Sequence, residues 1–283
     1  MPDGPLDPRD RPIAVFDSGV GGLTVLQELL VELPQEDFLY LGDTASFPYG
    51  ERSAAELEGF ALEITELLLT RRAKLLVVAC NAASAAALGA LRERMLSTTI
   101  GVEVVAVIEP ESRLAATTSS NRRVGLLATS ATVRSGAYTR ALAEHAPDVE
   151  LTSVACPDLA PIIQQGFPFD RRVVDTVRGY CAPLRDAGVD TVILGCTHYP
   201  LIAPMLQRML GPDVALVTSG RSLARTVSQS LANAGLRAAR PGEGDYRFLC
   251  TGDAETFREL GSRFLQMPIE AVERVAVGVA EAA

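Results

Sequence analysis

Lysine is almost absent from the sequence. Of the 26 basic residues in this chain of 283 residues, only Lys74 is a lysine, and all the others are arginines. No glycine-rich loop precedes Lys74, and neither serine nor threonine follows it, which excludes a P-loop nucleotide site. Lys74 borders an apolar run, which disfavours a Schiff-base cofactor because such a lysine must project into a site. We therefore expect chemistry that uses no cofactor.

Several other absences narrow the class of protein. No basic run is longer than two residues and the net charge is −9, so we expect no nucleic-acid partner. No apolar stretch reaches the length of a membrane span, and residues 1–11, which we expect to form a flexible tail, contain no apolar signal core. The five cysteines include no C-x-x-C pair. These features predict a cytoplasmic protein with reduced thiols and no membrane association.

Short apolar runs alternate with longer helical patterns along the chain. The runs predicted as strands are 13–16, 38–41, 75–79, 102–107, 124–128, 151–154, 191–194, 214–217 and 246–250. The segments predicted as helices are 23–32, 54–72, 83–95, 135–144, 171–187, 202–209 and 222–233, and 236–245 is predicted as a surface loop. Strands that are apolar throughout and separated by helices indicate parallel sheets covered on both faces, and nine strands suit two sheets better than one.

The two halves of the chain resemble one another. The apolar run before Ser18 is similar to the run before Ser130, and the run that ends in Cys80 is similar to the run that ends in Cys196. The spacing from serine to cysteine is 62 residues in the first half and 66 in the second. The simpler alternative is that two buried cysteines end two strands by chance. We predict an α/β fold with two pseudo-symmetric parallel-sheet domains that face each other across a cleft.

Two loops follow the first two predicted strands, at the end of the sheet where open parallel sheets bind ligands. Residues 17–22 read Asp-Ser-Gly-Val-Gly-Gly and open a helix, which predicts a small-anion cradle of free backbone N–H groups. The loop fails the dinucleotide-binding fingerprint, which would need a glycine at Thr24. The alternative is that the glycines only let helix and strand pack closely. The Pro48-Tyr49-Gly50 loop could present backbone N–H groups and a phenol, or be an ordinary turn.

Two cysteines end predicted strands and precede helices. Cys80 stands at a helix N-terminus, whose positive field should lower the pKa of the thiol from about 8.5 towards neutrality. Asn81, the next residue, is a good helix cap and hydrogen-bond donor. Cys196 again ends a strand, and His198 lies two residues further on. A Cys-x-His pair at such a turn is more specific than either residue alone, and the alternative for each is a packing or capping role.

One cysteine in each half, at the same place on its sheet, predicts two thiols that flank one cleft. A thiol hydrolase built on Cys196 and His198 would have no use for the second thiol. A zinc site needs three or four protein ligands, and only Cys80, Cys196 and His198 are good candidates in this sequence. We therefore expect no metal. Two thiols that face a single carbon suit proton removal on one face and proton donation on the other, which inverts a stereocentre without a cofactor.

These motifs together resemble the glutamate racemase family, within the cofactor-independent aspartate/glutamate racemase superfamily. The matching segments are 15–24, 42–44, 48–50, 79–81, 128–133, 135–138 and 195–201. The resemblance implies interconversion of L- and D-glutamate, which supplies D-glutamate for peptidoglycan. It also implies two α/β domains, with the C-terminal part of the chain returning to complete the first. The expected domains are 12–107 plus 218–283 for the first and 108–217 for the second, and we expect a homodimer.

The resemblance implies roles for individual residues. Cys80 and Cys196 match the two catalytic acid/base thiols, of which Cys80 handles the D-enantiomer and Cys196 the L-enantiomer. Asp17 would assist Cys80, and His198 would assist Cys196. The residues that match the family's substrate-binding pairs are Asp17 with Ser18, Tyr49 with Gly50, Asn81 with Ala82, and Thr197 with His198.

The sequence departs from the family pattern at three positions. Ala82 stands where threonine or serine is usual, so a side-chain hydroxyl to the substrate carboxylate is lost while the backbone N–H remains. Gln164 stands where a glutamate helps to tune the second-half site, which weakens the electrostatic support for His198. Ser46 replaces a frequent arginine before Pro-Tyr-Gly. Because both cysteines are retained, we expect an active enzyme with an altered rate or affinity.

Three other functions stay open at this point. The protein could be a racemase of aspartate or of another amino acid in the same superfamily. It could be a thiol amidohydrolase that uses Cys196 and His198, in which case it would release ammonia and tolerate Cys80→Ala. It could also be a degenerate binding protein that holds glutamate without turnover, in keeping with the departures at Ala82 and Gln164.

Overall fold

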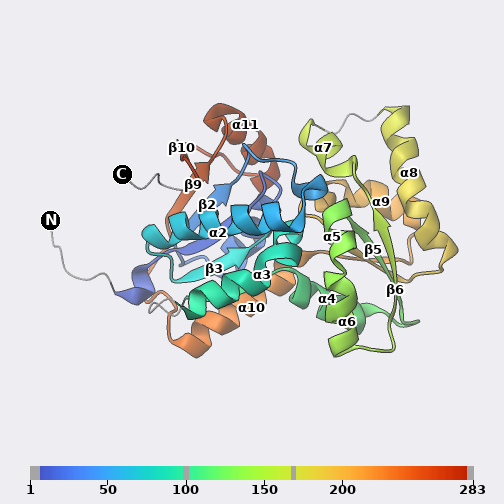
Figure 1. Ribbon diagram of the computed structural model, residues 1–283, viewed down its shortest axis with the longest axis horizontal. Coiled ribbons are helices and arrows are strands. Elements are labelled where there is room, and N and C mark those ends of the chain that lie inside the picture. Colours follow the sequence, from blue (N-terminus) through green and yellow to red (C-terminus); the bar gives the residue numbers. More distant parts are fainter. Residues whose placement is uncertain (1–6, 98–101, 167–169, 279–283) are drawn as a thin grey trace.

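The chain folds around two separate parallel β-sheets, as predicted. The computed structural model describes residues 7–97, 102–166 and 170–278. The six-stranded sheet has the order β10-β9-β2-β1-β3-β4 and comprises β1 (Ile13–Asp17), β2 (Phe38–Gly42), β3 (Leu75–Val78), β4 (Glu103–Ala106), β9 (Tyr246–Cys250) and β10 (Val272–Arg274). The four-stranded sheet has the order β6-β5-β7-β8 and comprises β5 (Arg123–Ala128), β6 (Glu150–Ala155), β7 (Thr191–Gly195) and β8 (Ala215–Val217). Figure 1 shows them in two lobes, with the first sheet on the left.

The two sheets repeat one topology. In the first sheet β1 lies between β2 and β3, with β4 beyond β3, and in the second β5 lies between β6 and β7, with β8 beyond β7. The predicted pseudo-symmetry is therefore confirmed, because β1 is equivalent to β5 and β3 is equivalent to β7. The strand order reverses between β1 and β3 and again between β5 and β7. These reversal points are where open α/β sheets form ligand-binding crevices.

Successive residues of the central strands face two different layers of helices. In β1, Val15 belongs to the hydrophobic cluster that includes α1 (Leu23–Glu32) and α10 (Ser219–Ala234). Its neighbour Phe16 belongs to the cluster that includes α2 (Ala54–Thr70) and α3 (Asn81–Leu96). Strands β1, β2, β3 and β7 are buried along their whole length. This burial on both faces explains why their sequences are apolar throughout rather than alternating.

The other α-helices of the described residues match the predicted segments only in part. They are α4 (Ile108–Thr118), α5 (Ser130–Ser135), α6 (Ala137–His145), α7 (Leu159–Gln164), α8 (Arg171–Asp186), α9 (Ala203–Leu210) and α11 (Ala254–Leu265). The helix predicted over 135–144 corresponds to α6, which begins at Ala137 because Gly136 adopts a left-handed conformation (φ 64°) between α5 and α6. Helices α4, α5, α7 and α11 and strand β10 are not among the predicted elements.

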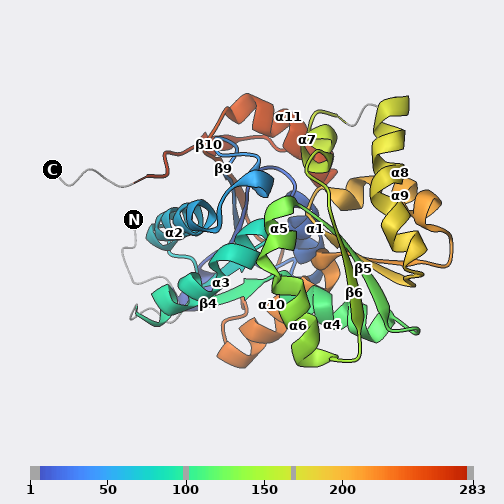
Figure 2. The same cartoon turned by 45° about the vertical axis from the view of Figure 1, so that its right-hand side comes forward.

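The chain returns to the first sheet after it has completed the second. Strand β9 pairs with β2, and β10 pairs with β9, so both extend the sheet that the N-terminal part begins. Helix α10 packs against α1 in the same lobe, and Figure 2 shows it beneath that lobe. This arrangement is the one that the resemblance implies, and the boundaries 12–107, 108–217 and 218–283 stay a prediction.

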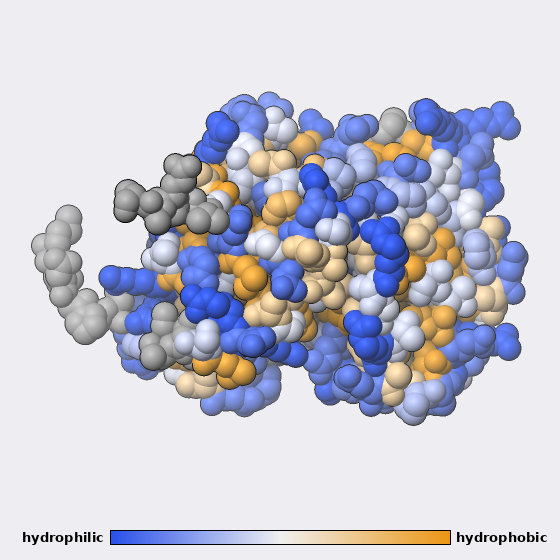
Figure 3. All heavy atoms as spheres, viewed as in Figure 1, coloured by the Kyte–Doolittle hydropathy of each residue, from blue (hydrophilic) through white to orange (hydrophobic). Residues whose placement is uncertain are grey.

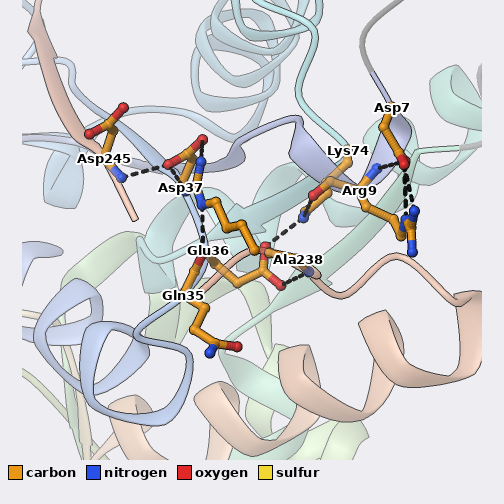
Figure 4. Close-up of polar contacts among 9 residues, drawn as sticks. Asp7, Arg9, Gln35, Glu36, Asp37, Lys74, Ala238 and Asp245 are labelled. Atoms are coloured by element: carbon orange, nitrogen blue, oxygen red, sulfur yellow. Dashed lines mark hydrogen bonds and ion pairs between the residues drawn. The ribbon is translucent and has the colours of Figure 1, made fainter. Parts of the chain in front are cut away.

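The one lysine holds the N-terminal segment against the first sheet, at the amino ends of its strands. Lys74 directly precedes β3, its side chain is buried, and its Nζ lies 2.5 Å from Glu36 Oε2. Nζ also donates a hydrogen bond to the Arg9 carbonyl oxygen at 2.6 Å (Figure 4). Arg9 belongs to a 3-10 helix, η1 (Pro8–Asp10), so the predicted flexible tail is wrong for that part of residues 1–11. Residues 1–6 lie outside the described residues.

Glu36, the buried carboxylate that pairs with Lys74, also binds the loop 236–245. Glu36 Oε1 accepts a hydrogen bond from the Ala238 N–H at 2.8 Å. Nearby, Asp37 forms an ion pair with Arg240 and accepts a hydrogen bond from the Asp245 N–H at 2.5 Å (Figure 4). The loop has no regular secondary structure, as predicted. The loop 236–245, Lys74 and the η1 helix are thus joined at the amino ends of the strands, whereas Cys80 lies at the carboxyl ends.

The exposed surface combines hydrophilic residues with scattered apolar ones. Figure 3 shows one face, on which hydrophilic residues predominate and apolar ones form small groups. The large hydrophobic side chains exposed in the described residues are Val31, Leu96, Leu114 and Met267. No helix in this part of the chain combines the length and the hydropathy that crossing a membrane requires.

Candidate active site

The carboxyl ends of equivalent strands meet at one cleft between the lobes. Cys80 follows β3 and Cys196 follows β7, so each cysteine stands beside the reversal point of its own sheet. The cleft-lining residues predicted for the site are Ser18, Tyr49, Gly50, Cys80, Asn81 and Ala82 from the first lobe, with Cys196, Thr197 and His198 from the second. Of the predicted site residues, Asp17 does not line the cleft and is fully buried behind it. The two halves of the sequence therefore bring their thiols to one place.

Cys80 is the N-cap of α3, and its thiol is buried in a site that disfavours charge. Burial raises the pKa of Cys80 to about 12, and the negative charge of Asp17 contributes to the rise. Donors to the sulfur oppose this shift: the Ala83 N–H and the hydroxyl and N–H groups of Ser18. The predicted fall of the thiol pKa towards neutrality is therefore wrong. The helix N-terminus does supply a donor, but desolvation outweighs it.

Cys196 lies in a similar environment in the second lobe. Burial raises the pKa of Cys196 well above its ordinary value, although the His198 N–H donates to the sulfur, and the charge of Cys80 raises the pKa further. The two thiols are thus close enough to influence each other's ionisation. The segment after Cys196 first forms a 3-10 helix, η3 (Tyr199–Ile202), and only then α9, so no α-helix N-terminus faces this sulfur directly.

His198 is packed between aromatic rings and is 1% exposed. Its ring centroid lies 5.6 Å from that of Phe47 and 5.4 Å from that of Phe264. Burial lowers the pKa of His198 to about 4, so the imidazole is neutral at pH 7. Nε2 lies 2.9 Å from Gln164 Oε1, an acceptor, which places the proton on Nε2. The unprotonated Nδ1 then lies 3.9 Å from the sulfur of Cys196.

The glycine-rich loop after β1 holds the carboxylate of Asp17 rather than an external anion. The Gly19 N–H donates to Asp17 Oδ2 at 3.2 Å, and the Gly22 N–H is a second donor. Thr197 donates to Oδ1 from the other lobe at 3.3 Å. Burial nevertheless raises the pKa of Asp17. Because these N–H groups bind Asp17 and the loop glycines do not line the cleft, the predicted small-anion cradle is wrong. Gly21 instead allows a close approach to the second lobe, since a Cβ there would lie 2.4 Å from Thr197 Oγ1.

Tyr49 and Gly50 begin η2 (Tyr49–Glu51), and both line the cleft. The Tyr49 hydroxyl donates to Asp43 Oδ2 at 2.7 Å, so its proton is already engaged. Burial and the charge of Asp43 raise the pKa of Tyr49. A Cβ on Gly50 would lie 3.2 Å from Thr129 Cβ, which shows how closely this loop approaches the second lobe.

A buried carboxyl group that no sequence motif reveals holds Asn81. Asn81 Nδ2 donates to Glu111 Oε2 at 3.2 Å and to the Tyr138 oxygen at 2.7 Å. Tyr138 donates its own proton to Glu111, and Ser219 Oγ donates to Glu111 Oε1 at 3.2 Å. Glu111 is fully buried, and burial raises the pKa of Glu111 to about 8. Asn81 Oδ1 is buried and has no hydrogen-bond partner among the described residues.

Comparison with known proteins assigns the family. Residues 23–227 match the family described as Asp/Glu/Hydantoin racemase. A glutamate racemase of Geobacter metallireducens is 43% identical over 255 residues, which cover 90% of this chain and 93% of that protein. The chain belongs to the glutamate racemase family.

Solved structures of glutamate racemases have the same fold. The enzyme of Bacillus anthracis superposes with a TM-score of 0.89 at 36% identity, covering 95% of this chain and 98% of that one. The enzyme of Francisella tularensis, in complex with D-glutamate, superposes with a TM-score of 0.87 at 32% identity and the same coverage. The resemblance stated from the motifs is therefore confirmed over nearly the whole chain.

The cleft of this glutamate racemase family member has few charged groups. Among its described lining residues the charged side chain is that of Glu51, and none is a lysine or arginine. The second lobe contributes Thr129, which the predicted site did not include. The internal repeat could have revealed it, since Thr129 follows β5 as Ser18 follows the equivalent strand β1. Gln164 reaches the site through His198, and Ser46 lies outside the cleft lining.

Proposed function

We propose that the protein interconverts L- and D-glutamate, with Cys80 and Cys196 as a pair of acid/base groups and without a cofactor. The observation that carries the proposal is that the two thiols follow equivalent strands of two equivalent sheets and line a single cleft. The family membership supports the reaction, and the D-glutamate bound to the Francisella tularensis relative supports the substrate.

The electrostatics of the cleft disfavour two thiolates at the same time, so at most one of the two cysteines is ionised during the reaction. The charge of Cys80 raises the pKa of Cys196, so ionising both cysteines together is costly. In one direction the Cys80 thiolate takes the α-proton of D-glutamate, and the Cys196 thiol donates its proton to the opposite face of the planar carbanion. The product is L-glutamate, with Cys80 protonated and Cys196 ionised. The reverse reaction exchanges the roles, so each group must act as acid and as base.

Each thiol has a neighbour that can assist it. The Nδ1 lone pair of His198 faces Cys196 at 3.9 Å and is placed to accept its proton. Asp17 acts on Cys80 through its charge, which stabilises the protonated thiol. The donors from Ser18 to the Cys80 sulfur act in the opposite sense and stabilise the thiolate. Burial and Asp17 outweigh these donors, so Cys80 rests as the protonated thiol, and the donors reduce the cost of forming the thiolate.

Substrate binding relies on dipoles rather than on cationic side chains. Both carboxylates of glutamate would be held by backbone N–H groups and by the hydroxyls of Ser18, Thr129 and Thr197, which line the cleft. To donate to the substrate, Ser18 and Thr197 would exchange their present hydrogen bonds to Cys80 and Asp17 for bonds to the carboxylates. At Ala82 the backbone N–H remains as a donor. Asn81, with its unpartnered Oδ1, is the natural acceptor for the substrate ammonium group.

Circular dichroism of L-glutamate and, separately, of L-aspartate tests the proposed function. With purified protein the glutamate signal should decay to zero and that of aspartate should persist. Faster decay with aspartate would favour an aspartate racemase. Ammonia release that survives Cys80→Ala would favour a Cys196 amidohydrolase, and binding without any decay would favour a glutamate-binding protein. Each of these outcomes contradicts the proposal.

Other parts of the proposal concern the cellular setting. We expect the product, D-glutamate, to supply peptidoglycan synthesis in the cytoplasm, and all five cysteines are free, as a reducing compartment would have them. We also expect a homodimer, which light scattering of the purified protein would detect. A monomer at micromolar concentration would contradict that expectation.

A further inference from the structure

Glu111 is a buried carboxyl group surrounded by hydrogen-bond donors instead of a cation. It lies on α4, and its donors come from three other helices: Asn81 of α3, Tyr138 of α6 and Ser219 of α10. No arginine, lysine or histidine of the described residues forms an ion pair with it. A carboxylate without a countercharge is costly to bury, so a purely structural role would be served better by an apolar side chain.

The network around Glu111 fixes the orientation of one amide in the cleft. An ionised carboxylate only accepts hydrogen bonds, so Asn81 must turn its Nδ2 group toward Glu111. The same Nδ2 also donates to the Tyr138 oxygen, whose proton is given to Glu111. Asn81 Oδ1 is consequently directed away from the network. It is left buried without a partner on a residue that lines the cleft next to Cys80.

We propose that Glu111 is a positioning residue, which holds the Asn81 amide so that Oδ1 accepts a hydrogen bond from the ammonium group of the amino-acid substrate. This inference rests on the proposed function, because it places an α-amino acid beside Cys80. An unpaired buried acceptor is unfavourable in the free protein, and an ammonium group satisfies it with a charge-assisted hydrogen bond. The negative charge of Glu111 behind the amide adds to the attraction. A dicarboxylate without an amino group gains neither the hydrogen bond to Asn81 Oδ1 nor the attraction by the charge of Glu111.

The protonation state of Glu111 should control this arrangement. The titratable group in hydrogen-bond contact with it is Tyr138, whose own pKa is raised in part by the charge of Cys196, while the contacts from α3 and α10 are an amide and a hydroxyl. Burial raises the pKa of Glu111 to about 8. Below that pH the carboxyl carries a proton that it can donate to Tyr138 or Ser219, and the amide of Asn81 is no longer forced into one orientation. The KM for glutamate should therefore fall as the pH rises from 7 to 8.5.

The test compares two ligands in wild-type protein and Glu111→Gln. The ligands are D-glutamate and glutarate, which has the same two carboxylates and no ammonium group. One charge-assisted hydrogen bond corresponds to roughly a tenfold change in affinity, so at pH 8.5, where the Glu111 carboxylate is ionised, the KM for D-glutamate should rise about tenfold in Glu111→Gln. The inhibition constant of glutarate should stay within about twofold or improve, kcat should change less than KM, and the pH-dependent fall of KM should disappear.

Matched variants separate positioning from general damage. Glu109→Gln removes an exposed carboxylate from the same helix and should change neither constant. Tyr138→Phe removes the hydroxyl that links Asn81 to Glu111 and should reproduce the selective loss, which also covers the case in which Glu111→Gln does not fold. An unchanged KM for D-glutamate, or an equal loss for D-glutamate and glutarate, would overturn the inference. Calorimetric titration measures both affinities without turnover, so a wild-type protein that binds glutamate and fails to racemise it would refute the proposed function and leave the role of Glu111 testable.

Discussion

His198 Nε2 lies 2.9 Å from the amide oxygen of Gln164. A neutral amide at this position accepts one hydrogen bond and adds no charge, so nothing offsets the desolvation that lowers the pKa of His198 to about 4. The imidazole therefore stays neutral, with its Nδ1 lone pair toward Cys196. This contact decides how the second-lobe thiol can lose its proton.

Gln164→Glu should move the acid limb of kcat/KM to lower pH. A carboxylate beside Nε2 stabilises the imidazolium, and an imidazolium beside Cys196 favours its thiolate. A shift of about one pH unit corresponds to roughly 1.4 kcal/mol of added interaction. The pH profile of glutamate racemisation measures the shift. Gln165→Glu adds the same charge at an exposed neighbouring residue and should leave the profile in place. An equal shift in both variants would refute the local explanation.

Asp17→Asn should also lower the pH at which activity begins. The negative charge of Asp17 raises the pKa of Cys80, so its removal lowers that pKa and the thiolate forms at lower pH. Because the equilibrium constant between enantiomers is one, kcat/KM is equal in both directions and the limb must move equally for L- and D-glutamate. The plateau rate should fall, since an assisting group is lost. A limb that moves to higher pH would show that Asp17 stabilises the thiolate instead.

Glu111→Gln should stabilise the fold more at alkaline than at acidic pH. Burial raises the pKa of Glu111 from its ordinary value of 4.5 to about 8, so the folded state binds its proton more tightly than the unfolded state. The free energy of unfolding of the wild type therefore falls as the pH rises from 4.5 to 8, by on the order of a few kcal/mol. Thermal melts at pH 5.5 and pH 8.5 measure this. The gain in Tm of the variant should be larger at pH 8.5, and a gain that does not depend on pH would contradict the account.

Lys74→Met should destabilise the protein without changing the chemistry. The substitution leaves Glu36 buried without its cation, which costs about 3–5 kcal/mol. Arg94→Met breaks an ion pair with Glu66 that is largely exposed, and it should cost less than about 1 kcal/mol. Urea unfolding compares the two. Because Lys74 and Cys80 lie at opposite ends of β3, kcat and KM of the folded Lys74→Met protein should match the wild type. Equal costs in the two variants would contradict the structural role of the lysine.

The sequence predicts the sheets well because burial on both faces leaves a clear pattern. The continuous apolar runs of β1, β2, β3 and β7 are recognisable by themselves, and the structure places them within one or two residues of the predicted bounds. Strand β10 has three residues, none of them buried, and so carries no such signal. Helix α11 has a signal in the sequence, because its N-cap residue is Asp253 and aspartate is a preferred N-cap. In the structure the Asp253 side chain accepts a hydrogen bond from the Thr256 N–H.

The sequence predicts those site residues that stand directly after a recognisable strand. Cys80 and Cys196 stand directly after apolar runs, so their meeting follows from the internal repeat and the edge rule for parallel sheets. Glu111 joins the site because separate helices meet in space, which no local pattern reveals, whereas the position of Thr129 directly after β5 could have been inferred from the internal repeat. The rise of the thiol pKa was likewise hidden, because the sequence shows the helix N-terminus next to Cys80 but not the burial that outweighs it.

Deuterium incorporation in heavy water tests most directly whether Cys80 and Cys196 act as a pair. With Cys196→Ala, D-glutamate should exchange its α-proton through Cys80, and with Cys80→Ala, L-glutamate should exchange through Cys196. Racemisation should fall by a factor of about 10² to 10⁴ in each variant, since each lacks the group that protonates the opposite face. Racemisation that continues at the wild-type rate in either variant would contradict the two-thiol mechanism.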